Sequence, residues 1–318
     1  SYNSTPNIYS WYEGQLNYNG VTCDVWWINL PNGIPANSNV TIYMDIGPSS
    51  FNYYFYYYPY VGTNAQVIGT MEYDNGNYTF IAYGYFDNTF DGWKGYTSGS
   101  FSPTATSNGI EMLNDQMNWE GTYILPPNNG NIPLIPLIVE EAWYYTSGAD
   151  ANVISLFGNT NQQIYAVIIG STDGGSTLAS NLSTFVQFEY WNGNSPPYSQ
   201  ATMLKSAATD QYLNYTYFPS SNATVYSYLI VNSSYAQTGY YIYTSNQVWA
   251  PLTLLDMYPL SYNPNYGNYT YSNLNYNPFQ YGTLEIGAGQ NVASYQYIEW
   301  VVVRAYPPNG VMPSIYIS

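Results

Sequence analysis

The sequence predicts an all-β protein, in which a short N-terminal β module precedes an antiparallel sandwich of the jelly-roll type. Short runs rich in Val, Ile, Tyr, Phe and Thr recur along most of the 318 residues. Clusters of Gly, Asn, Pro and Ser separate these runs, and no long segment has the 3.6-residue apolar period of a helix. Many short strands with such punctuation favour a sandwich over a parallel sheet.

The predicted strands follow one another along most of the chain. They are Val40–Asp45, Tyr78–Phe86, Gln163–Ile169, Thr184–Trp191, Thr224–Val231, Tyr240–Thr244 and Tyr297–Val303. Turn clusters lie at Asn128–Asn131, Asp173–Ser176 and Asn192–Pro197. A single helical turn is the most that Gly109–Trp119 suggests. Tyr53–Tyr60 places tyrosines on both faces of an extended segment, which favours cross-strand packing, with a subunit interface or a glycan-stacking platform as alternatives.

A step in composition near residue 72 predicts the domain boundaries. Residues 1–72 are too few for a complete two-sheet sandwich, so they are expected to be a β module completed by strand exchange between copies. Residues 73–306 are sufficient for a jelly roll. Residues 307–318 are expected to form an extended C-terminal tail, which begins with the turn residues Pro307–Gly310.

Basic side chains are almost absent from this chain. Lys94, Lys205 and Arg304 are the only three, histidine is missing, and the formal net charge is −16 at pH 7. Binding to nucleic acid or to an anionic membrane requires several Lys or Arg on one face, so both classes of partner are excluded. Arg304 stands in an apolar strand, where its charge is expected to be paired or its stem packed against aromatic rings.

The same composition predicts tolerance of acid. At pH ~2–3 most of the 19 carboxyl groups would be neutral, leaving a net charge of about +3 to +4 rather than the large positive charge that drives acid unfolding. Neutral Asn, Ser, Thr, Gln and Tyr keep the surface polar at any pH. An acidophilic setting is therefore the first interpretation, and an acidic extracellular protein at neutral pH is the second.

Catalytic chemistry is restricted by the missing histidine. Ser-His-Asp and Cys-His sites are excluded, zinc-ligand clusters are absent, and no phosphate-binding glycine motif is present. A carboxylate pair of the glycosidase kind is the surviving alternative, with candidates Glu140, Glu141, Glu189 and Glu299. Glu140 and Glu141 are adjacent, so in a strand they face opposite sides. The sequence predicts no catalytic residue and no enzyme.

No cofactor and no metal are predicted either. Oxygen ligands for Ca²⁺ exist at Asp87 with Asp91, and at Asp173. In turns rich in Gly and Asn, however, Asp side chains more often cap the backbone themselves. Cys23 is alone, which excludes an intrachain disulfide, and a buried apolar role is favoured over a reactive thiol.

Several features predict a secreted chain whose signal peptide has been removed. The sequence begins at Ser1, without a basic apolar leader, and no apolar run reaches the length of a membrane span. Eight N-x-S/T sequons are predicted N-glycosylation sites. They are Asn3, Asn39, Asn77, Asn181, Asn214, Asn222, Asn232 and Asn268.

Three blocks carry a resemblance to a known family. They are Trp26–Ser38 running into Thr41–Met44, then Tyr73–Gly76 with Phe80 and Phe86, and finally Glu299–Pro313. In these blocks the chain resembles secreted archaeal surface proteins, which pair an N-terminal β module of the DUF2341 type with a concanavalin A-like, or laminin G-like, jelly roll. The resemblance implies an exported, surface-associated protein and carries no active site. The family has more sequence before the first block than this chain has.

Two functions follow as hypotheses. The first is a structural subunit of an extracellular archaeal filament or surface layer, with copies of itself and N-glycans as partners. In it, an N-terminal donor strand would complete the next subunit through Asn7, Ile8, Tyr9, Trp11 and Tyr12. The second is a carbohydrate-binding, lectin-like surface module, whose mark would be exposed aromatic rings beside Asn or Asp.

Overall fold

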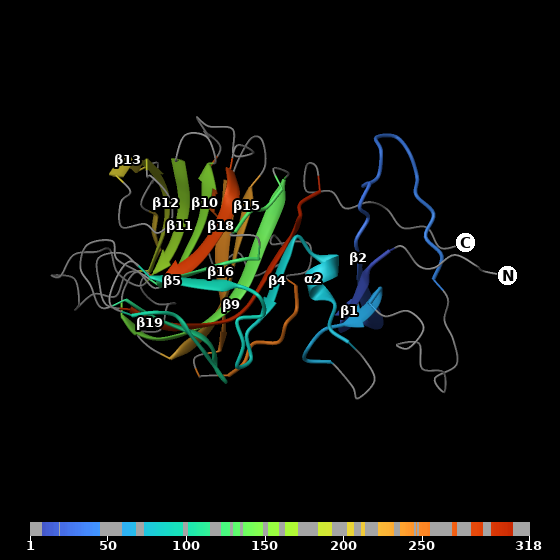
Figure 1. Ribbon diagram of the computed structural model, residues 1–318, viewed down its shortest axis with the longest axis horizontal. Coiled ribbons are helices and arrows are strands. Elements are labelled where there is room, and N and C mark those ends of the chain that lie inside the picture. Colours follow the sequence, from blue (N-terminus) through green and yellow to red (C-terminus); the bar gives the residue numbers. More distant parts are fainter. Residues whose placement is uncertain are drawn as a thin grey trace. The chain divides into compact units, whose positions relative to one another are not determined.

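The computed structural model confirms the all-β class, with antiparallel pairing throughout its two large sheets (Figure 1). It describes residues 8–18, 20–44, 59–67, 73–97, 101–114, 122–127, 130–133, 136–148, 152–158, 163–170, 184–192, 202–206, 211–213, 222–231, 236–244, 246, 248–254, 269–271, 281–288 and 294–307. The chain divides into two compact units. The first unit is Ser1–Ile81 with Pro251–Leu254, and the second is Ala82–Ala250 with Leu255–Ser318.

The first unit is built on a three-stranded sheet. Its strands are β1 (Ser10–Tyr18), β2 (Val21–Ile28) and β3 (Val61–Thr63), in the order β2-β1-β3. β1 pairs antiparallel with β2 and parallel with β3, so the first strand of the chain occupies the middle of the sheet.

One tryptophan forms the centre of this unit. Trp11 is fully buried, and its ring meets Phe80 edge-on, with the ring centroids 5.1 Å apart. Its indole Nε1 donates to Asp74 Oδ1 at 2.9 Å, so the polar atom of the buried ring is satisfied. Asp74 also accepts the backbone N–H of Gly76, which begins the short helix α2 (Gly76–Thr79).

A segment from far along the chain completes the unit. The backbone N–H of Leu254 donates to Glu13 Oε1 at 2.9 Å, while Trp27 Nε1 donates to Glu13 Oε2 at 2.6 Å. Asn64 Nδ2 donates to the carbonyl of Leu252 at 2.7 Å, more than 180 residues away. These bonds explain why Pro251–Leu254 belongs to the first unit rather than to its sequence neighbours.

The unit boundary lies between Ile81 and Ala82, not at residue 72 as the composition predicts. Residues 73–79 stay with the first unit because Asn75 Nδ2 donates to the carbonyls of Ser10 and Pro59, at 3.0 and 2.9 Å. Of the predicted tail, only Pro307 is among the described residues.

The second unit consists of two eight-stranded antiparallel sheets. The β10 sheet has the order β13-β12-β11-β10-β18-β8-β5, with β14 paired to β12. Its strands are β5 (Lys94–Thr97), β8 (Thr122–Leu125), β10 (Asn152–Gly158), β11 (Gln163–Gly170), β12 (Thr184–Asn192), β13 (Thr202–Ser206), β14 (Gln211–Leu213) and β18 (Tyr281–Ala288).

The β9 sheet has the order β17-β16-β15-β9-β19-β7-β6, with β4 paired to β19. Its strands are β4 (Ala82–Tyr85), β6 (Thr104–Thr106), β7 (Gly109–Asn114), β9 (Leu137–Gly148), β15 (Ala223–Val231), β16 (Ala236–Thr244), β17 (Tyr269–Tyr271) and β19 (Ser294–Ala305).

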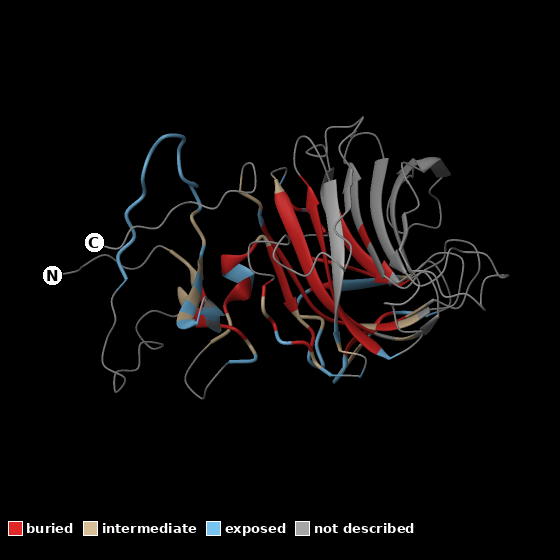
Figure 2. Cartoon of the chain, turned by 180° about the vertical axis from the view of Figure 1, so that it is seen from behind, coloured by how far each residue is buried: buried red, intermediate tan, exposed pale blue. Residues whose placement is uncertain are grey.

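The central strands of the β9 sheet are buried on both faces, as the red strands of Figure 2 show. On the inner face, Gln296 Nε2 donates across to the carbonyl of Gly287 in the β10 sheet at 2.9 Å. Aliphatic residues such as Val139, Leu229 and Val301 alternate with the residues of the opposite, outer face. A strand covered on both sides reads as a continuous apolar run, which is how Thr224–Val231 reads in the sequence.

Five predicted strands are confirmed, namely Gln163–Ile169, Thr184–Trp191, Thr224–Val231, Tyr240–Thr244 and Tyr297–Val303. Val40–Asp45 is wrong, since the described residues Val40–Met44 are exposed and pair with no described strand. A β-prone run becomes a strand only beside a second strand. Tyr78–Phe86 begins in α2 and is a strand only over β4. Within the predicted Gly109–Trp119 turn, Gly109–Asn114 forms β7, and residues 115–119 lie outside the described residues.

Among the described residues, no helix is long and apolar enough to cross a membrane. The helix α2 spans only four residues.

Candidate functional site

The outer face of the β9 sheet is aromatic. By register, Tyr144 of β9, Tyr226 of β15 and Trp300 of β19 all lie on this face, which is turned away from the β10 sheet. The Tyr226 ring lies 5.6 Å from the ring of Trp300 and 5.6 Å from that of Tyr243, measured between centroids. The inner face carries mainly aliphatic residues together with the buried Trp143.

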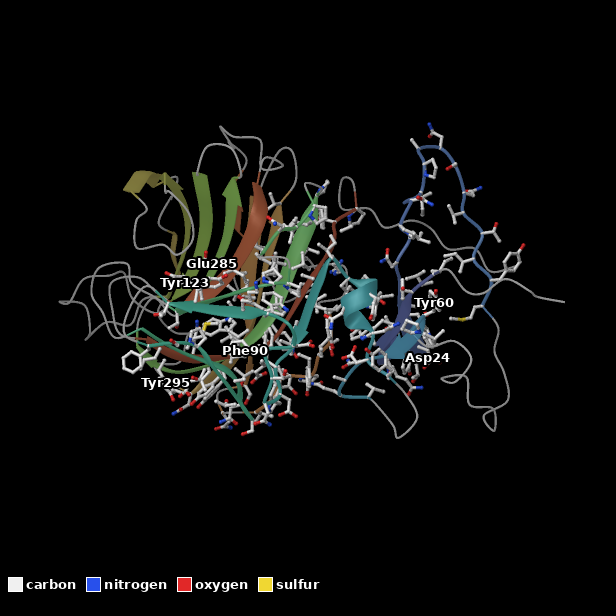
Figure 3. All side chains as sticks on the ribbon, viewed as in Figure 1. Asp24, Tyr60, Phe90, Tyr123, Glu285 and Tyr295 are labelled. Atoms are coloured by element: carbon white, nitrogen blue, oxygen red, sulfur yellow. The ribbon has the colours of Figure 1, made fainter. Side chains whose placement is uncertain are left out.

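A carboxylate stands among tyrosines where β7, β19 and β9 run side by side. Tyr297 of β19 is opposite Glu111 of β7 on one side and Tyr144 of β9 on the other. The hydroxyls of Tyr295, labelled in Figure 3, and of Tyr297 both donate to Glu111 Oε1. The Tyr297 hydroxyl has a single hydrogen, which is shared between Glu111 Oε1 at 3.4 Å and the Tyr295 hydroxyl at 2.9 Å. We call Glu111, Tyr144, Tyr295, Tyr297 and Asn222 the tyrosine cluster.

Tyr144 links Tyr297 to Asn222 within the cluster. Its ring is buried and stacks on that of Tyr297, with centroids 6.0 Å apart and ring planes at 23°. Its hydroxyl donates to Asn222 Oδ1 at 2.7 Å. Asn222 adopts the left-handed backbone region, with φ 59°, immediately before β15. The ring of Tyr297 is therefore fixed in orientation by its neighbours on both adjoining strands.

The tyrosine hydroxyls of the cluster resist ionisation. Burial raises the pKa of Tyr297, and the charge of Glu111 together with their hydrogen bond raises it further. Burial also raises the pKa of Tyr144. Both phenols consequently stay protonated and act as hydrogen-bond donors over the whole physiological range of pH.

Glu111 retains accepting capacity. Both tyrosine bonds go to Oε1, and Oε2 has no hydrogen bond to any part of the chain that the structure describes. Glu111, Tyr295 and Tyr297 are all half-buried, so the carboxylate group and the two aromatic residues beside it are partly exposed. A carboxylate oxygen of this kind can accept the hydroxyl groups of a ligand.

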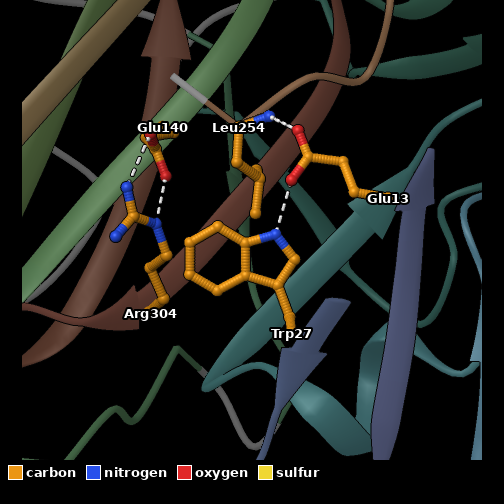
Figure 4. Close-up of polar contacts among 5 residues, drawn as sticks. All are labelled: Glu13, Trp27, Glu140, Leu254 and Arg304. Atoms are coloured by element: carbon orange, nitrogen blue, oxygen red, sulfur yellow. Dashed lines mark hydrogen bonds and ion pairs between the residues drawn. The ribbon is translucent and has the colours of Figure 1, made fainter. Parts of the chain in front are cut away.

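The carboxylates predicted as glycosidase candidates have structural partners. Arg304 Nε and Nη2 donate to the two oxygens of Glu140 at 2.6 and 3.0 Å, which confirms the expected pairing of Arg304 (Figure 4). Glu141 Oε1 accepts from Ser227 Oγ at 2.7 Å, and that hydroxyl accepts from Trp143 Nε1 at 3.0 Å. Glu140 and Glu141 lie on opposite faces of β9 and form no catalytic pair.

Two further carboxyl groups are buried and neutral. Burial raises the pKa of Glu285 to about 8, and neither of its oxygens has a hydrogen-bond partner among the described residues. Burial likewise raises the pKa of Glu299 to about 8, although Oε2 accepts the N–H of Ala250 at 2.7 Å. Glu285 lies near Tyr123 on the neighbouring strand, as labelled in Figure 3. The fourth candidate, Glu189, lies in β12, where the structure describes the strand but not this side chain.

The calcium candidates Asp91 and Asp87 accept hydrogen bonds from nearby groups of the chain. Asp91 Oδ2 accepts the N–H of Tyr85 at 3.1 Å, and Asp87 Oδ1 accepts Asn88 Nδ2 at 2.7 Å. Across the described ranges, no three His, Cys, Asp or Glu side chains come together as a metal site. Asp173 lies outside the described residues. Cys23 is half-buried on β2 and is a free thiol.

Three of the predicted glycosylation sites lie in the described part of the chain. Asn39, Asn77 and Asn222 are all exposed. The other five, Asn3, Asn181, Asn214, Asn232 and Asn268, lie outside it. Attachment of a glycan at any of the eight stays a prediction.

The predicted donor strand forms part of the chain's own first unit. Trp11 is fully buried there, Ile8, Tyr9 and Tyr12 are half-buried, and Asn7 lies outside the described residues. The Tyr9 ring stacks on those of Tyr60 and Tyr78. Exchange of this strand between copies would preserve the same contacts, so the donor-strand assignment stays a prediction.

The sequence did not single out the tyrosine cluster. Tyr295 and Tyr297 alternate in a strand, which is a signal that both face one side. No local pattern indicates that Glu111 or Tyr144 would join them, because they come from strands that are distant in sequence.

Comparison with known proteins identifies one viral relative. No protein-family model matches the chain. Uncharacterized protein 562 of Sulfolobus islandicus rod-shaped virus 1 is 28% identical over 327 residues, an alignment that covers 98% of this chain and 50% of that protein. The chain thus spans about half the length of the curated relative that it matches. Membership of the archaeal surface family stays a prediction.

Solved structures with some similarity include a lectin, a sugar-bound exoplasmic domain and a catalytic domain. The exoplasmic domain of VIP36 bound to Ca²⁺ and Man3GlcNAc is 11% identical, with a TM-score of 0.39 over 74% of this chain and 90% of that one. Winged bean acidic lectin with methyl-α-D-galactose is 9% identical, with a TM-score of 0.37 over 69% and 94%. The catalytic domain of PdAgaC is 12% identical, with a TM-score of 0.39 over 73% and 89%. The absence of enzymatic activity stays a prediction.

Proposed function

We propose that this chain is a carbohydrate-binding surface module that takes neutral glycans at the tyrosine cluster. The observation that supports it is the half-buried Glu111, which uses one oxygen to hold two tyrosine hydroxyls and leaves the other open. Sugar rings have apolar C–H faces that pack on aromatic rings, and hydroxyl groups that donate to carboxylates. The aromatic rings of the cluster can pack on the C–H face of a sugar, and the Glu111 carboxylate can accept a hydrogen bond from one of its hydroxyl groups.

The charge of the chain restricts the ligand class. A net charge of −16 and the Glu111 carboxylate both repel acidic sugars, so neutral hexoses are the favoured ligands. Tyr144 and Tyr297 need no rearrangement on binding, since each is already held by a ring contact and a hydroxyl bond. Preorganisation of this kind lowers the entropic cost of binding.

Affinity electrophoresis tests the proposal. The full chain is run through gels that contain a neutral glucan, mannan or galactan, and retardation by at least one of them is expected. Glu111→Gln and Tyr295→Ala should each reduce the retardation by about tenfold in apparent affinity, since each loses roughly one hydrogen bond or ring contact.

Asp87→Asn is the matched control. Asp87 also belongs to the second unit, and among the described residues its carboxylate accepts a hydrogen bond only from Asn88. Asp87 does not belong to the tyrosine cluster, so its replacement should leave the retardation unchanged. Equal retardation of Glu111→Gln and the wild type would exclude the cluster as the binding site.

A second candidate function is the filament subunit that the sequence suggests. It is supported by the position of β1, which lies between β2 and β3 in the sheet of the first unit. A copy of β1 from another subunit could occupy the same place with the same bonds, and a repeated head-to-tail exchange would give a polymer. An extracellular location and N-glycans belong to this proposal.

Electron microscopy of a chain that lacks residues 1–12 tests the exchange. Loss of polymers is the expected result, and a synthetic peptide of residues 7–18 should bind the shortened chain one to one without restoring polymers. Polymers of normal length from the shortened chain would contradict it. Trp11→Phe serves as the matched variant, because Phe keeps an aromatic ring at the buried position and lacks the Nε1 that donates to Asp74.

A further inference from the structure

The hairpin of β1 and β2 carries a second group of aromatic and polar side chains. Tyr12 is opposite Trp26, and Gln15 is opposite Asp24, in the register of the two strands. The rings of Tyr12 and Trp26 lie 4.9 Å apart between centroids, with their planes at 41°. The four side chains therefore lie together on one face of the hairpin.

A β-bulge is what brings them to the same face. In a regular strand, residues 12 and 15 would point to opposite sides, because their spacing is odd. The register shifts between Tyr12 and Gly14, so that Glu13 is the extra residue. Gly14 has φ 132°, a conformation that side chains other than glycine's rarely adopt. Gln15 consequently joins Tyr12, while Glu13 bonds to Trp27.

This face is open to solvent. Trp26 is 36% exposed, Asp24 and Gln15 are exposed, and Tyr12 is half-buried. The opposite face of the hairpin carries Trp11, which is fully buried. The sheet thus packs its core on one side and presents aromatic rings to water on the other, an arrangement typical of binding surfaces.

Asp24 uses one oxygen and leaves the other open. Its Oδ1 accepts the Tyr12 hydroxyl at 2.8 Å and Gln15 Nε2 at 3.2 Å. Its Oδ2 has no hydrogen bond to any described residue. The same arrangement recurs at Glu111, where one oxygen holds tyrosine hydroxyls and the other is available.

We propose that Tyr12, Gln15, Asp24 and Trp26, here called the hairpin platform, form a second binding site for a neutral pyranose sugar. The two rings pack on the C–H face of the sugar, and Asp24 Oδ2 accepts one of its hydroxyl groups. The Asp24 carboxylate repels acidic sugars, which selects neutral ones. The inference rests on the proposed function only for the class of ligand, because the residues and the unit are different.

Calorimetric titration of the full chain tests the platform. The probes are neutral hexasaccharides of glucose, mannose and galactose. The wild type should bind two molecules of at least one probe, and Trp26→Ala should weaken one of the two sites by about tenfold or more. Asp24→Asn should weaken the same site, and Glu111→Gln the other.

Two measurements keep the test independent of folding. Trp26 is partly exposed, so the denaturant midpoint of Trp26→Ala should stay near that of the wild type. Val21→Ala is the matched control, because Val21 is an exposed apolar residue of β2, 61% exposed, and does not belong to the platform. It should leave both sites unchanged.

The outcomes separate the two proposals. One site that is insensitive to Trp26→Ala and Asp24→Asn overturns the platform and leaves the tyrosine cluster standing. One site that is lost in Trp26→Ala and kept in Glu111→Gln supports the platform and overturns the cluster. Binding of no probe overturns both. Light scattering that shows a wild-type dimer and a Trp26→Ala monomer identifies the face as a protein interface instead, which also overturns the platform.

Discussion

Arg304 and Glu140 form a bidentate ion pair inside the β9 sheet, with N–O distances of 2.6 and 3.0 Å. The Arg304 side chain is 6% exposed and that of Glu140 is 0% exposed. Two of the few charges in the chain are thus removed from water together, and each is neutralised by the other (Figure 4).

Glu140→Gln should destabilise the protein by about 3–5 kcal/mol, because it removes the charge that is bonded to two nitrogens of the buried Arg304 guanidinium. Urea unfolding followed by fluorescence measures the change. The double variant Glu140→Leu with Arg304→Met should recover most of the loss, since it removes both charges. If the double variant were as unstable as Glu140→Gln, the loss of stability would come from altered packing rather than from the unpaired charge.

Stability should fall as pH rises from about 4.5 to about 8. Glu285 and Glu299 each have a folded-state pKa of about 8, above the ordinary value of 4.5. In this window the folded chain holds protons that the unfolded chain has released, so raising the pH favours unfolding. The expected loss is on the order of a few kcal/mol for each group.

Thermal unfolding at a series of pH values checks this prediction, with Glu285→Gln as the comparison. The amide cannot ionise, so the variant should lose the pH dependence of one group and be more stable than the wild type at pH 9. Parallel curves for the two proteins would contradict a protonated Glu285. Its protonation also agrees with the acid tolerance that the composition predicts.

Gly287→Ala should destabilise the second unit by about 1–3 kcal/mol through overpacking. A Cβ at this position would lie 2.1 Å from Tyr123 Cδ1, closer than any real contact. Gly95→Ala is the control, because its nearest atom would be Pro103 Cγ at 3.1 Å, which requires a smaller adjustment. If the two variants had the same denaturant midpoint, the ring of Tyr123 would be able to move away from the added Cβ at little cost.

Glycan attachment should differ between the described sequons when the chain is already folded. Asn39 and Thr41 are both exposed, so an enzyme can reach the whole sequon. Thr224, in the sequon of Asn222, is fully buried and donates to the carbonyl of Val248 at 2.9 Å. Thr79, in the sequon of Asn77, is also buried.

Mass spectrometry of folded protein treated with a glycosyltransferase extract should therefore find a glycan on Asn39 and none on Asn77 or Asn222. Denatured protein is the control, and all three should then be acceptors. Modification of Asn222 in the folded chain at the rate of Asn39 would show that β15 opens readily.

The class of the fold and several of the strands could be predicted from the sequence. Thr224–Val231 and Tyr297–Val303 are β-prone runs in which apolar residues predominate, and both are central strands because such runs require cover on two faces. Pairing of the Arg304 charge was one of two alternatives that its place in an apolar strand suggested, because an isolated buried charge requires a partner.

The two candidate sites could not be predicted from the sequence. The central strand β9 contains Glu140 and Glu141, whose charges conceal its apolar pattern. Val40–Met44 has a strong β pattern yet pairs with no described strand. The tyrosine cluster joins strands that are distant in the chain, and the hairpin platform depends on the bulge at Glu13, which composition does not reveal.

The sequence by itself thus determined a chain poor in charge, rich in tyrosine and β in structure, because composition and alternation are local properties. Only the tertiary structure decided which carboxylates are paired, which are neutral and which remain open beside aromatic rings. Strand register and bulges place these groups, and register depends on pairing between segments far apart in sequence. Glu140, Glu285 and Glu111 are the same residue type, and their environments alone separate an ion pair, a buried neutral acid and a candidate ligand contact.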